Sequence, residues 1–231
     1  MIKKLIKKGL LTAGLEIKRK LKGGPDPIHL WETEEHFNSL YSQVNTHTLV
    51  SRVRCFILYK FFSHTRTLPG DVAEVGVYRG GTAKFLALLN GEYQLNKNIY
   101  LFDTFGGMPE TSAEKDLHKE GDFSDTSLEG VLAYLKGLQR ISLHRGLFPG
   151  TAGPVKDKKF SFVHLDVDIY KSVLDCCDFF YPRMVQGGII IFDDYGFVSC
   201  PGAKLAVDEF FKDKKETPVY LQSGQCLIIK L

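Results

Sequence analysis

A chain of 231 residues with 44% hydrophobic and 25% charged residues has an ordinary globular composition and can bury a sizeable core. Its net charge of +3 is unevenly distributed, because residues 1–22 carry +7 and the remainder therefore carries −4. The body of the chain thus lacks the basic surplus of a nucleic-acid-binding protein, and we expect no nucleic-acid partner.

The chain begins with a basic segment, residues 1–24, whose apolar residues recur at helical spacing with lysines between them. This pattern predicts an amphipathic helix or arm, and residues 1–22 suit peripheral contact with an acidic membrane surface or a partner chain. The alternative is a solvated arm or a helix docked on the body. No stretch reaches the ~18 apolar residues of a membrane-spanning helix. Residues 25–69 follow as a helical extension, with a continuous helical pattern over 32–65.

From residue 70 to the C-terminus, apolar runs alternate with helical patterns. Strands are expected at 71–77, 98–102, 141–144, 160–165 and 188–192, helices at 80–89, 126–138, 172–180 and 203–211, and two short closing strands at 218–221 and 225–231. Thr126 and Glu129 have the spacing of a capping box for the second of these helices. The alternation predicts one α/β domain over 70–231, a doubly wound Rossmann-like sheet that is mostly parallel with an antiparallel C-terminal edge.

A glycine-rich turn, Glu74-Val75-Gly76-Val77-Tyr78-Arg79-Gly80-Gly81-Thr82, joins the first strand to the first helix. Its GxxxGG pattern is not the GxGxxG fingerprint of dinucleotide-binding proteins, and the chain has no P-loop motif. Backbone N–H groups at this turn suit a ligand carboxylate, and Glu74 suits an ammonium group. The second strand ends at Asp103, an acid placed to accept hydrogen bonds from ribose hydroxyls.

Two later strands each end in a pair of carboxylates. Asp166 and Asp168 follow one apolar run, and we expect them to share a face of an extended chain; Asp193 and Asp194 follow the next run. Because the carboxyl ends of parallel strands meet at one edge, four acids would gather there, and a divalent cation would relieve their repulsion. Oxygen ligands favour Mg²⁺, with Mn²⁺ or Ca²⁺ as alternatives. Otherwise these acids are helix caps.

Two further features bear on the site and its location. The connection between Asp103 and Thr126 is long and lacks periodicity, so we interpret it as a lid over the site, with disorder as the alternative. The five cysteines form no CxxC pair and no metal-ligand spacing, which indicates a reducing, cytoplasmic location.

Five blocks in order, 74–81, 101–109, 162–168, 187–196 and 201–204, resemble the macrocin O-methyltransferase (TylF-type) family. The resemblance covers about residue 52 to the C-terminus and implies a Rossmann-like methyltransferase fold. It also implies an enzyme that uses S-adenosylmethionine and Mg²⁺ to methylate a sugar hydroxyl on a glycosylated natural product or surface glycan. We also expect a homo-oligomer.

The resemblance implies metal ligands at Asp166, Asp193 and Asp194 and a general base at Asp168. The candidate cofactor contacts are Glu74, Gly76, Tyr78, Gly80, Gly81, Thr82, Asp103 and Thr104. Two alternatives remain open. A catechol-type phenol could chelate the same ion and be methylated instead, or the chain could be a non-catalytic cofactor-binding module, although none of the acids is missing.

Overall fold

The computed structural model of the chain describes residues 28–231. The predicted amphipathic helix of residues 1–24, and with it the predicted membrane contact, lies outside the described residues. The chain divides into two units, residues 1–30 and residues 31–231. The division into segments 1–24, 25–69 and 70–231 stays a prediction. None of the helices in the described part of the chain has the length and apolar character needed to cross a membrane.

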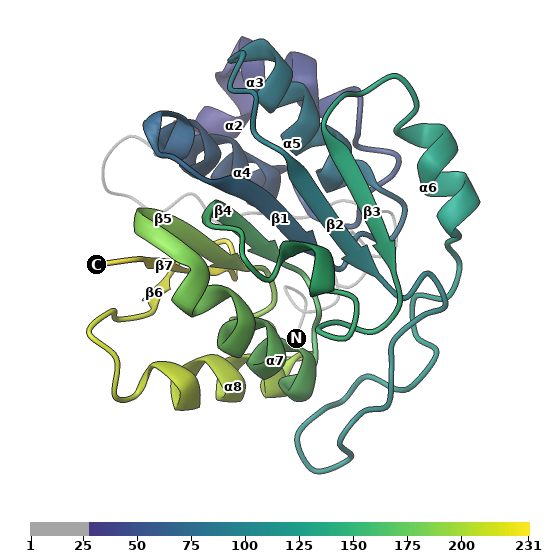
Figure 1. Ribbon diagram of the computed structural model, residues 1–231, viewed down its shortest axis with the longest axis vertical. Coiled ribbons are helices and arrows are strands. Elements are labelled where there is room, and N and C mark those ends of the chain that lie inside the picture. The colour runs from purple at the N-terminus through teal and green to yellow at the C-terminus, as the bar shows by residue number, and fades with distance from the viewer. Residues whose placement is uncertain (1–27) are drawn as a thin grey trace, which may run out of the picture. The chain divides into compact units, whose positions relative to one another are not determined.

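A seven-stranded sheet forms the centre of residues 31–231, in the order β3-β2-β1-β4-β5-β7-β6 (Figure 1). The strands are β1 (Asp71–Val75), β2 (Ile99–Asp103), β3 (Ile141–Arg145), β4 (Phe160–Leu165), β5 (Met184–Phe192), β6 (Val219–Tyr220) and β7 (Cys226–Ile229). Strands β1 to β5 are parallel, and β7 pairs antiparallel with both β5 and β6. The predicted fold class is confirmed.

The α-helices are α2 (Leu30–Thr33), α3 (Glu35–Tyr41), α4 (Arg52–His64), α5 (Gly81–Glu92), α6 (Leu128–Tyr134), α7 (Tyr170–Phe180) and α8 (Pro201–Phe211). Three short 3₁₀ turns cover Thr65–Thr67, Gly153–Val155 and Tyr181–Arg183. The helical region expected over 32–65 is therefore interrupted, because turns occupy the residues between α3 and α4.

The predicted capping box at α6 is wrong in its first residue. Ser127 is the N-cap, and its Oγ accepts a hydrogen bond from the Gly130 N–H at 3.1 Å. The hydroxyl of Thr126 instead donates to the Tyr78 carbonyl, which ties the start of α6 to the glycine-rich turn.

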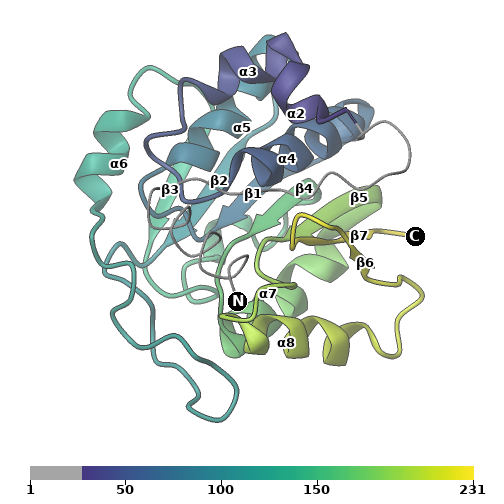
Figure 2. The same cartoon turned by 180° about the vertical axis from the view of Figure 1, so that it is seen from behind.

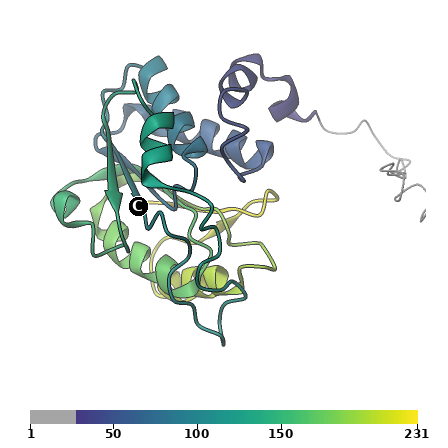
Figure 3. The same cartoon turned by 90° about the vertical axis from the view of Figure 1, so that its right-hand side faces the viewer.

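Two hydrophobic layers enclose the sheet, since alternate strand residues point to opposite faces. On one face, Phe162 of β4 packs edge-on against Phe62 of α4, with ring centroids 5.4 Å apart, in the core shared with α3 and α5. On the other face, Val163 and Leu165 join the core formed with α7 and α8. Figures 2 and 3 show the helices on the two sides of the sheet.

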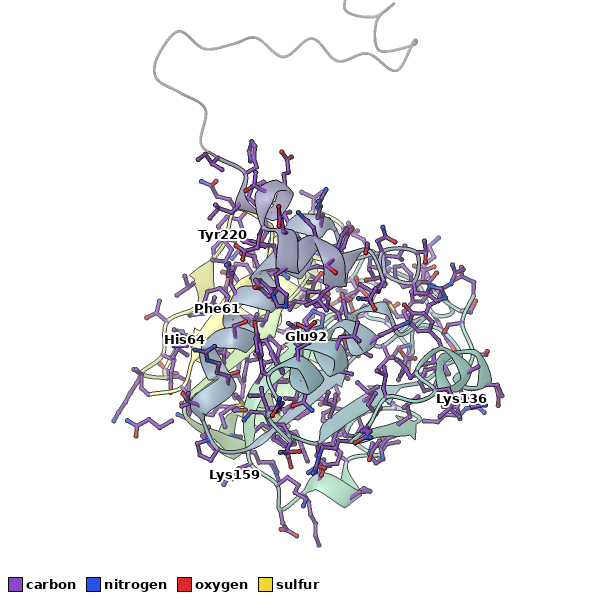
Figure 4. The ribbon with its side chains drawn as sticks, turned by 90° about the horizontal axis from the view of Figure 1, so that it is seen from above. Phe61, His64, Glu92, Lys136, Lys159 and Tyr220 are labelled. Atoms are coloured by element: carbon purple, nitrogen blue, oxygen red, sulfur yellow. The ribbon has the colours of Figure 1, made fainter. Side chains whose placement is uncertain are left out.

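The first layer brings the N-terminal helices against the sheet. Glu92, labelled in Figure 4 at the end of α5, has its Oε2 atom 2.5 Å from Nε2 of His36 on α3. Phe61 and His64, labelled in the same view, belong to α4. These helices cover one face of the sheet, while the carboxyl ends of β1, β2, β4 and β5 open at one edge, where ligands of such sheets bind.

Candidate functional site

A cavity of about 290 Å³ opens at the carboxyl edge of the sheet. Segments that follow β1, β2, β3, β4 and β5 all contribute to its walls, together with residues from the turn before α4. The cavity lining includes His47, Arg54, Gly76, Tyr78, Thr82, Asp103, Thr104, Met108, His118, Gly146, Leu147, Phe148, Asp166, Asp168, Asp194, Phe197, Ser199 and Cys200.

The glycine-rich turn is held in place by Asp103. Its Oδ2 accepts hydrogen bonds from the backbone N–H groups of Val77 at 2.7 Å and Tyr78 at 2.8 Å, and its Oδ1 accepts one from Phe105 at 2.6 Å. A carboxylate has about four acceptor positions, so Asp103 keeps capacity for a further donor in the cavity.

Gly76 is the position where this turn requires glycine. Its φ of +86° lies in the left-handed region, and a Cβ there would stand 1.8 Å from the Asp166 carbonyl oxygen. The close approach lets the turn after β1 pack directly on the turn after β4. Gly76, a candidate cofactor contact, and Asp166, the first of the paired acids, are therefore in backbone contact.

We expect Gly76→Ala to destabilise the protein by at least about 1–3 kcal/mol, the usual cost of a strained backbone conformation, with the clash added to it. Thermal and chemical unfolding measure this. Gly91→Ala is the matched control, because nothing lies within 4 Å of its added Cβ. That helix substitution should be neutral or stabilise by up to about 1 kcal/mol. Equal stability of the two variants would contradict the steric argument.

The predicted cofactor residues divide into two groups. Gly76, Tyr78, Thr82, Asp103 and Thr104 line the cavity, whereas, among the described residues, Glu74, Gly80 and Gly81 do not. Gly80 is the left-handed N-cap of α5, and the Gly81 N–H donates to the His47 carbonyl at 3.1 Å.

Glu74 is fully buried beneath the turn. Its Oε1 lies 2.9 Å from Nδ1 of His164, and within the described part of the chain its Oε2 has no hydrogen-bond partner. A contact between Glu74 and a ligand ammonium group stays a prediction.

Three of the four paired acids, Asp166, Asp168 and Asp194, line the cavity. Burial is the largest cause of their perturbed acidity: it raises the pKa of Asp166 to about 6 and the pKa of Asp168 above its usual range. Burial, followed by the neighbouring Asp166 and Asp168, raises the pKa of Asp194 well above its usual value. The ionised carboxylates are thus unfavourable together, which is the electrostatic situation that a bound cation relieves.

We expected Asp166 and Asp168 to share a face because the chain is extended there, and this reason is wrong. β4 ends at Leu165, and Asp168 has a φ of +56°, so the segment turns rather than continuing as an extended strand. Asp is among the residues that tolerate this conformation. The Asp168 N–H donates to Asp194 Oδ2 at 3.1 Å, and this contact joins the two acid pairs.

Asp193 belongs to a separate, buried network. It pairs with the guanidinium of Arg54 from α4, and its Oδ1 accepts a hydrogen bond from Gln225 Nε2 at 2.7 Å. His164 Nε2 lies 3.3 Å from the same oxygen, so this buried histidine is a packed, hydrogen-bonded residue. Ligand atoms of His164, Asp166 and Asp193 all lie within 4.8 Å of one another, so Asp193 remains within reach of an ion beside Asp166.

The segment between Asp103 and Thr126 is ordered against the site. Asp116 Oδ1 accepts the Tyr170 N–H at 2.8 Å and so caps α7, while its Oδ2 accepts the Ser112 N–H at 3.0 Å. Thr104, Met108 and His118 of this segment line the cavity. The segment therefore forms one wall of the site, and its predicted role as a moving lid stays a prediction.

Sequence reasoning missed several lining residues. Gly146, Leu147 and Phe148 follow β3, and they could have been found from the rule that all parallel strands end at the same edge. His47 and Arg54 come from the N-terminal helical region, for which the sequence gives no such signal.

Comparisons with known proteins bear on the fold and on the family. The family model described as macrocin-O-methyltransferase (TylF) matches residues 44–222. A curated relative from Streptomyces olivaceus, 8-demethyl-8-(2,3-dimethoxy-alpha-L-rhamnosyl)-tetracenomycin-C 4'-O-methyltransferase, is 32% identical over 148 residues. That match covers 59% of this chain and 57% of the relative, so the chain spans little more than half of that protein's length.

A second relative, demethyldecarbamoylnovobiocin O-methyltransferase from Streptomyces niveus, is 25% identical over 209 residues, which is 80% of this chain and 79% of the relative. The solved structure of the O-methyltransferase NovP matches with a TM-score of 0.72 and 18% identity, covering 86% of this chain and 99% of that one, and it supports the fold. Because the family model covers most of its length, the chain belongs to the macrocin-O-methyltransferase (TylF) family.

Proposed function

We propose that the protein is an S-adenosylmethionine-dependent O-methyltransferase. The observation that carries this proposal is a single cavity lined both by the Gly76 turn with Asp103 and by Asp166, Asp168 and Asp194. A cofactor site and an acidic reaction site thus adjoin at the carboxyl edge of the sheet. Family membership supports the reaction class.

The residues present fit the cofactor. The free acceptor capacity of Asp103 suits ribose hydroxyls, and the apolar side chains of Leu147, Phe148 and Met108 suit a flat adenine ring. S-adenosylmethionine would supply an electrophilic methyl group on its sulfonium. Gly76 allows close approach of a ligand to the backbone, and Thr82 at the start of α5 adds a polar wall.

The acids fit a hard divalent ion, and we assign Mg²⁺ to Asp166, Asp193 and Asp194. Support comes from the raised pKa values of Asp166 and Asp194, which reflect the cost of burying ionised carboxylates, to which the neighbouring acids add. Oxygen-only ligands favour magnesium over zinc. The ion would lower the pKa of a nearby acceptor hydroxyl. Asp193 also forms an ion pair with Arg54, so its role as a metal ligand is the least direct of the three.

Asp168 is assigned as the general base. It lines the cavity beside the other acids, and its side chain is 17% exposed, so it can face a substrate while largely shielded from water. A hydroxyl held in the cavity would transfer its proton to this carboxylate as the methyl group arrives. Apolar walls such as Phe197 limit the access of competing water.

The acceptor is assigned as a sugar hydroxyl on a glycosylated small molecule. Support comes from the names of the relatives, one of which acts on a rhamnosyl tetracenomycin and another on demethyldecarbamoylnovobiocin. A catechol-type phenol is the competing acceptor. Self-association into a homo-oligomer stays a prediction.

We expect S-adenosylmethionine to bind the purified protein in a calorimetric titration, and a radiolabelled methyl group to pass to a glycosylated acceptor but not to its aglycone. The panel should include simple catechols and NAD. Transfer to catechols alone would replace the acceptor assignment. Binding of NAD without any binding of S-adenosylmethionine would contradict the proposed function.

A further inference from the structure

Beside the proposed magnesium site lies a cluster of a different chemical type. His118 comes from the segment before α6, Asp168 from the turn after β4 and Cys200 from the N-cap of α8. The Cys200 Sγ atom lies 3.6 Å from His118 Nε2 and 3.4 Å from Asp168 Oδ1, and His118 Nε2 lies 3.8 Å from the same Asp168 oxygen. All three residues line the cavity.

The triangle has the size of a metal-binding face. Zinc–ligand distances of about 2.0–2.3 Å in a tetrahedral site place neighbouring ligand atoms roughly 3.3–3.8 Å apart. The two edges at sulfur, 3.4 and 3.6 Å, fall in this range, and the nitrogen–oxygen edge, 3.8 Å, lies at its upper end and would shorten on metal binding. Two of the edges are hydrogen bonds of the Cys200 sulfur, to Asp168 and with His118, whereas the longest edge, His118 to Asp168, exceeds hydrogen-bond length.

Neighbouring side chains hold the candidate ligands in place, as they do in known zinc sites. The other ring nitrogen of His118, Nδ1, lies 3.1 Å from Asp122 Oδ2, the carboxylate–histidine pairing that orients metal-bound imidazoles. The Ser199 hydroxyl lies 3.4 Å from the Cys200 sulfur. Asp116, through its contact with Tyr170, anchors the segment that carries His118, so little further ordering is needed before a metal binds.

The donor set selects the kind of ion. One imidazole nitrogen, one carboxylate oxygen and one thiolate sulfur suit Zn²⁺ and similar borderline ions, whereas Mg²⁺ prefers oxygen ligands only. Three protein ligands would leave the fourth tetrahedral position open for water.

We propose that His118, Asp168 and Cys200 form a second metal site that binds Zn²⁺, and that zinc bound there blocks methyl transfer by occupying Asp168. The binding site stands by itself, while the block rests on the proposed function of Asp168. Zinc binding displaces the thiol proton of Cys200 to solvent. The enzyme would thus require a hard ion and be inhibited by a borderline one.

The first test titrates the full-length, metal-free protein with Zn²⁺ by calorimetry in excess Mg²⁺, and with Co²⁺ by absorption spectroscopy. We expect one zinc site that Mg²⁺ does not displace, and a cobalt–thiolate charge-transfer band. Cys200→Ser and His118→Gln should each weaken zinc binding by at least about 100-fold, since loss of an outer-shell partner alone costs 10–100-fold. Cys200→Ser should also abolish the cobalt band.

Cys55→Ser and His36→Gln are matched controls that should leave zinc binding unchanged. The Cys55 thiol is buried and donates to the Val50 carbonyl at 3.5 Å, and His36 lies near Glu92, outside the cavity lining. Circular dichroism checks that each variant is folded, and each of the two ligand variants tests the site independently. Undiminished zinc affinity in folded Cys200→Ser or His118→Gln, or loss of the cobalt band in Cys55→Ser, would overturn the site.

The block is tested by comparing each protein's methyl-transfer rate with and without zinc. We expect inhibition of the wild-type protein at stoichiometric zinc and a loss of that sensitivity in Cys200→Ser. Zinc that binds without slowing transfer would overturn the block. If the wild-type protein transfers no methyl group even without zinc, the proposed function fails, and the zinc titration still decides the site.

Discussion

Replacement of Asp168 by Asn is expected to lower kcat by about 10²–10⁴, the usual contribution of general-base catalysis. Asn keeps the shape and hydrogen-bonding capacity of the side chain but cannot accept the proton of the acceptor hydroxyl. Asp168 is not one of the proposed cofactor contacts, so the affinity for S-adenosylmethionine should change little. Steady-state kinetics at saturating cofactor and calorimetric titration measure the two quantities separately.

The matched control for this variant is Asp175→Asn. Asp175 lies on α7 after the same turn, but it pairs with Lys171 Nζ at 2.5 Å and does not belong to the cavity lining. Its replacement should leave kcat near the wild-type value. If Asp168→Asn also retained near-normal kcat, the proton would have to pass to water or to another side chain, and the assignment of Asp168 would fail.

The fold could be predicted because its determinants are local. Apolar runs such as 160–165 are buried on both faces, as the fully buried β4 confirms, and their alternation with helical patterns leaves few topologies. The position of the acids followed from the same reasoning, since ionised side chains must lie at the open ends of such strands. The capping error at α6 shows the limit. Thr126 and Ser127 are both good N-caps, and the contact of Thr126 with Tyr78 decides between them.

The composition of the site could not be predicted where partners are distant in the chain. Asp193 looked equivalent to Asp194 in the sequence, but Arg54, 139 residues away in the chain, turns it into a buried ion pair. The five cysteines show no metal-ligand spacing, and only the fold brings Cys200 near His118, 82 residues away. These contacts depend on how α4, α8 and the 104–126 segment pack around the sheet.

Removal of divalent ions by chelation is expected to lower kcat by about 10²–10³, since a Lewis acid contributes several kcal/mol to such a reaction. Added Mg²⁺ should restore the rate and stabilise the protein against unfolding, by about 2.7 kcal/mol when its concentration is 100 times Kd. The apparent Kd from thermal shifts tests the site without any acceptor. Full activity after exhaustive chelation would remove the metal from the mechanism and leave these acids as structural caps.

Variants of the adjacent Asp193 and Asp194 should separate a metal site from structural caps through effects of opposite sign. In the metal-free protein, Asp194→Asn removes a carboxyl whose ionised form is disfavoured by burial and then by Asp166 and Asp168, so the free energy of unfolding should rise. Asp193→Asn leaves Arg54 without its buried partner and should destabilise by about 3–5 kcal/mol. Both variants should lose the stabilisation by Mg²⁺. Since a helix cap stabilises the fold, destabilisation by Asp194→Asn with an unchanged response to Mg²⁺ would identify Asp194 as a cap.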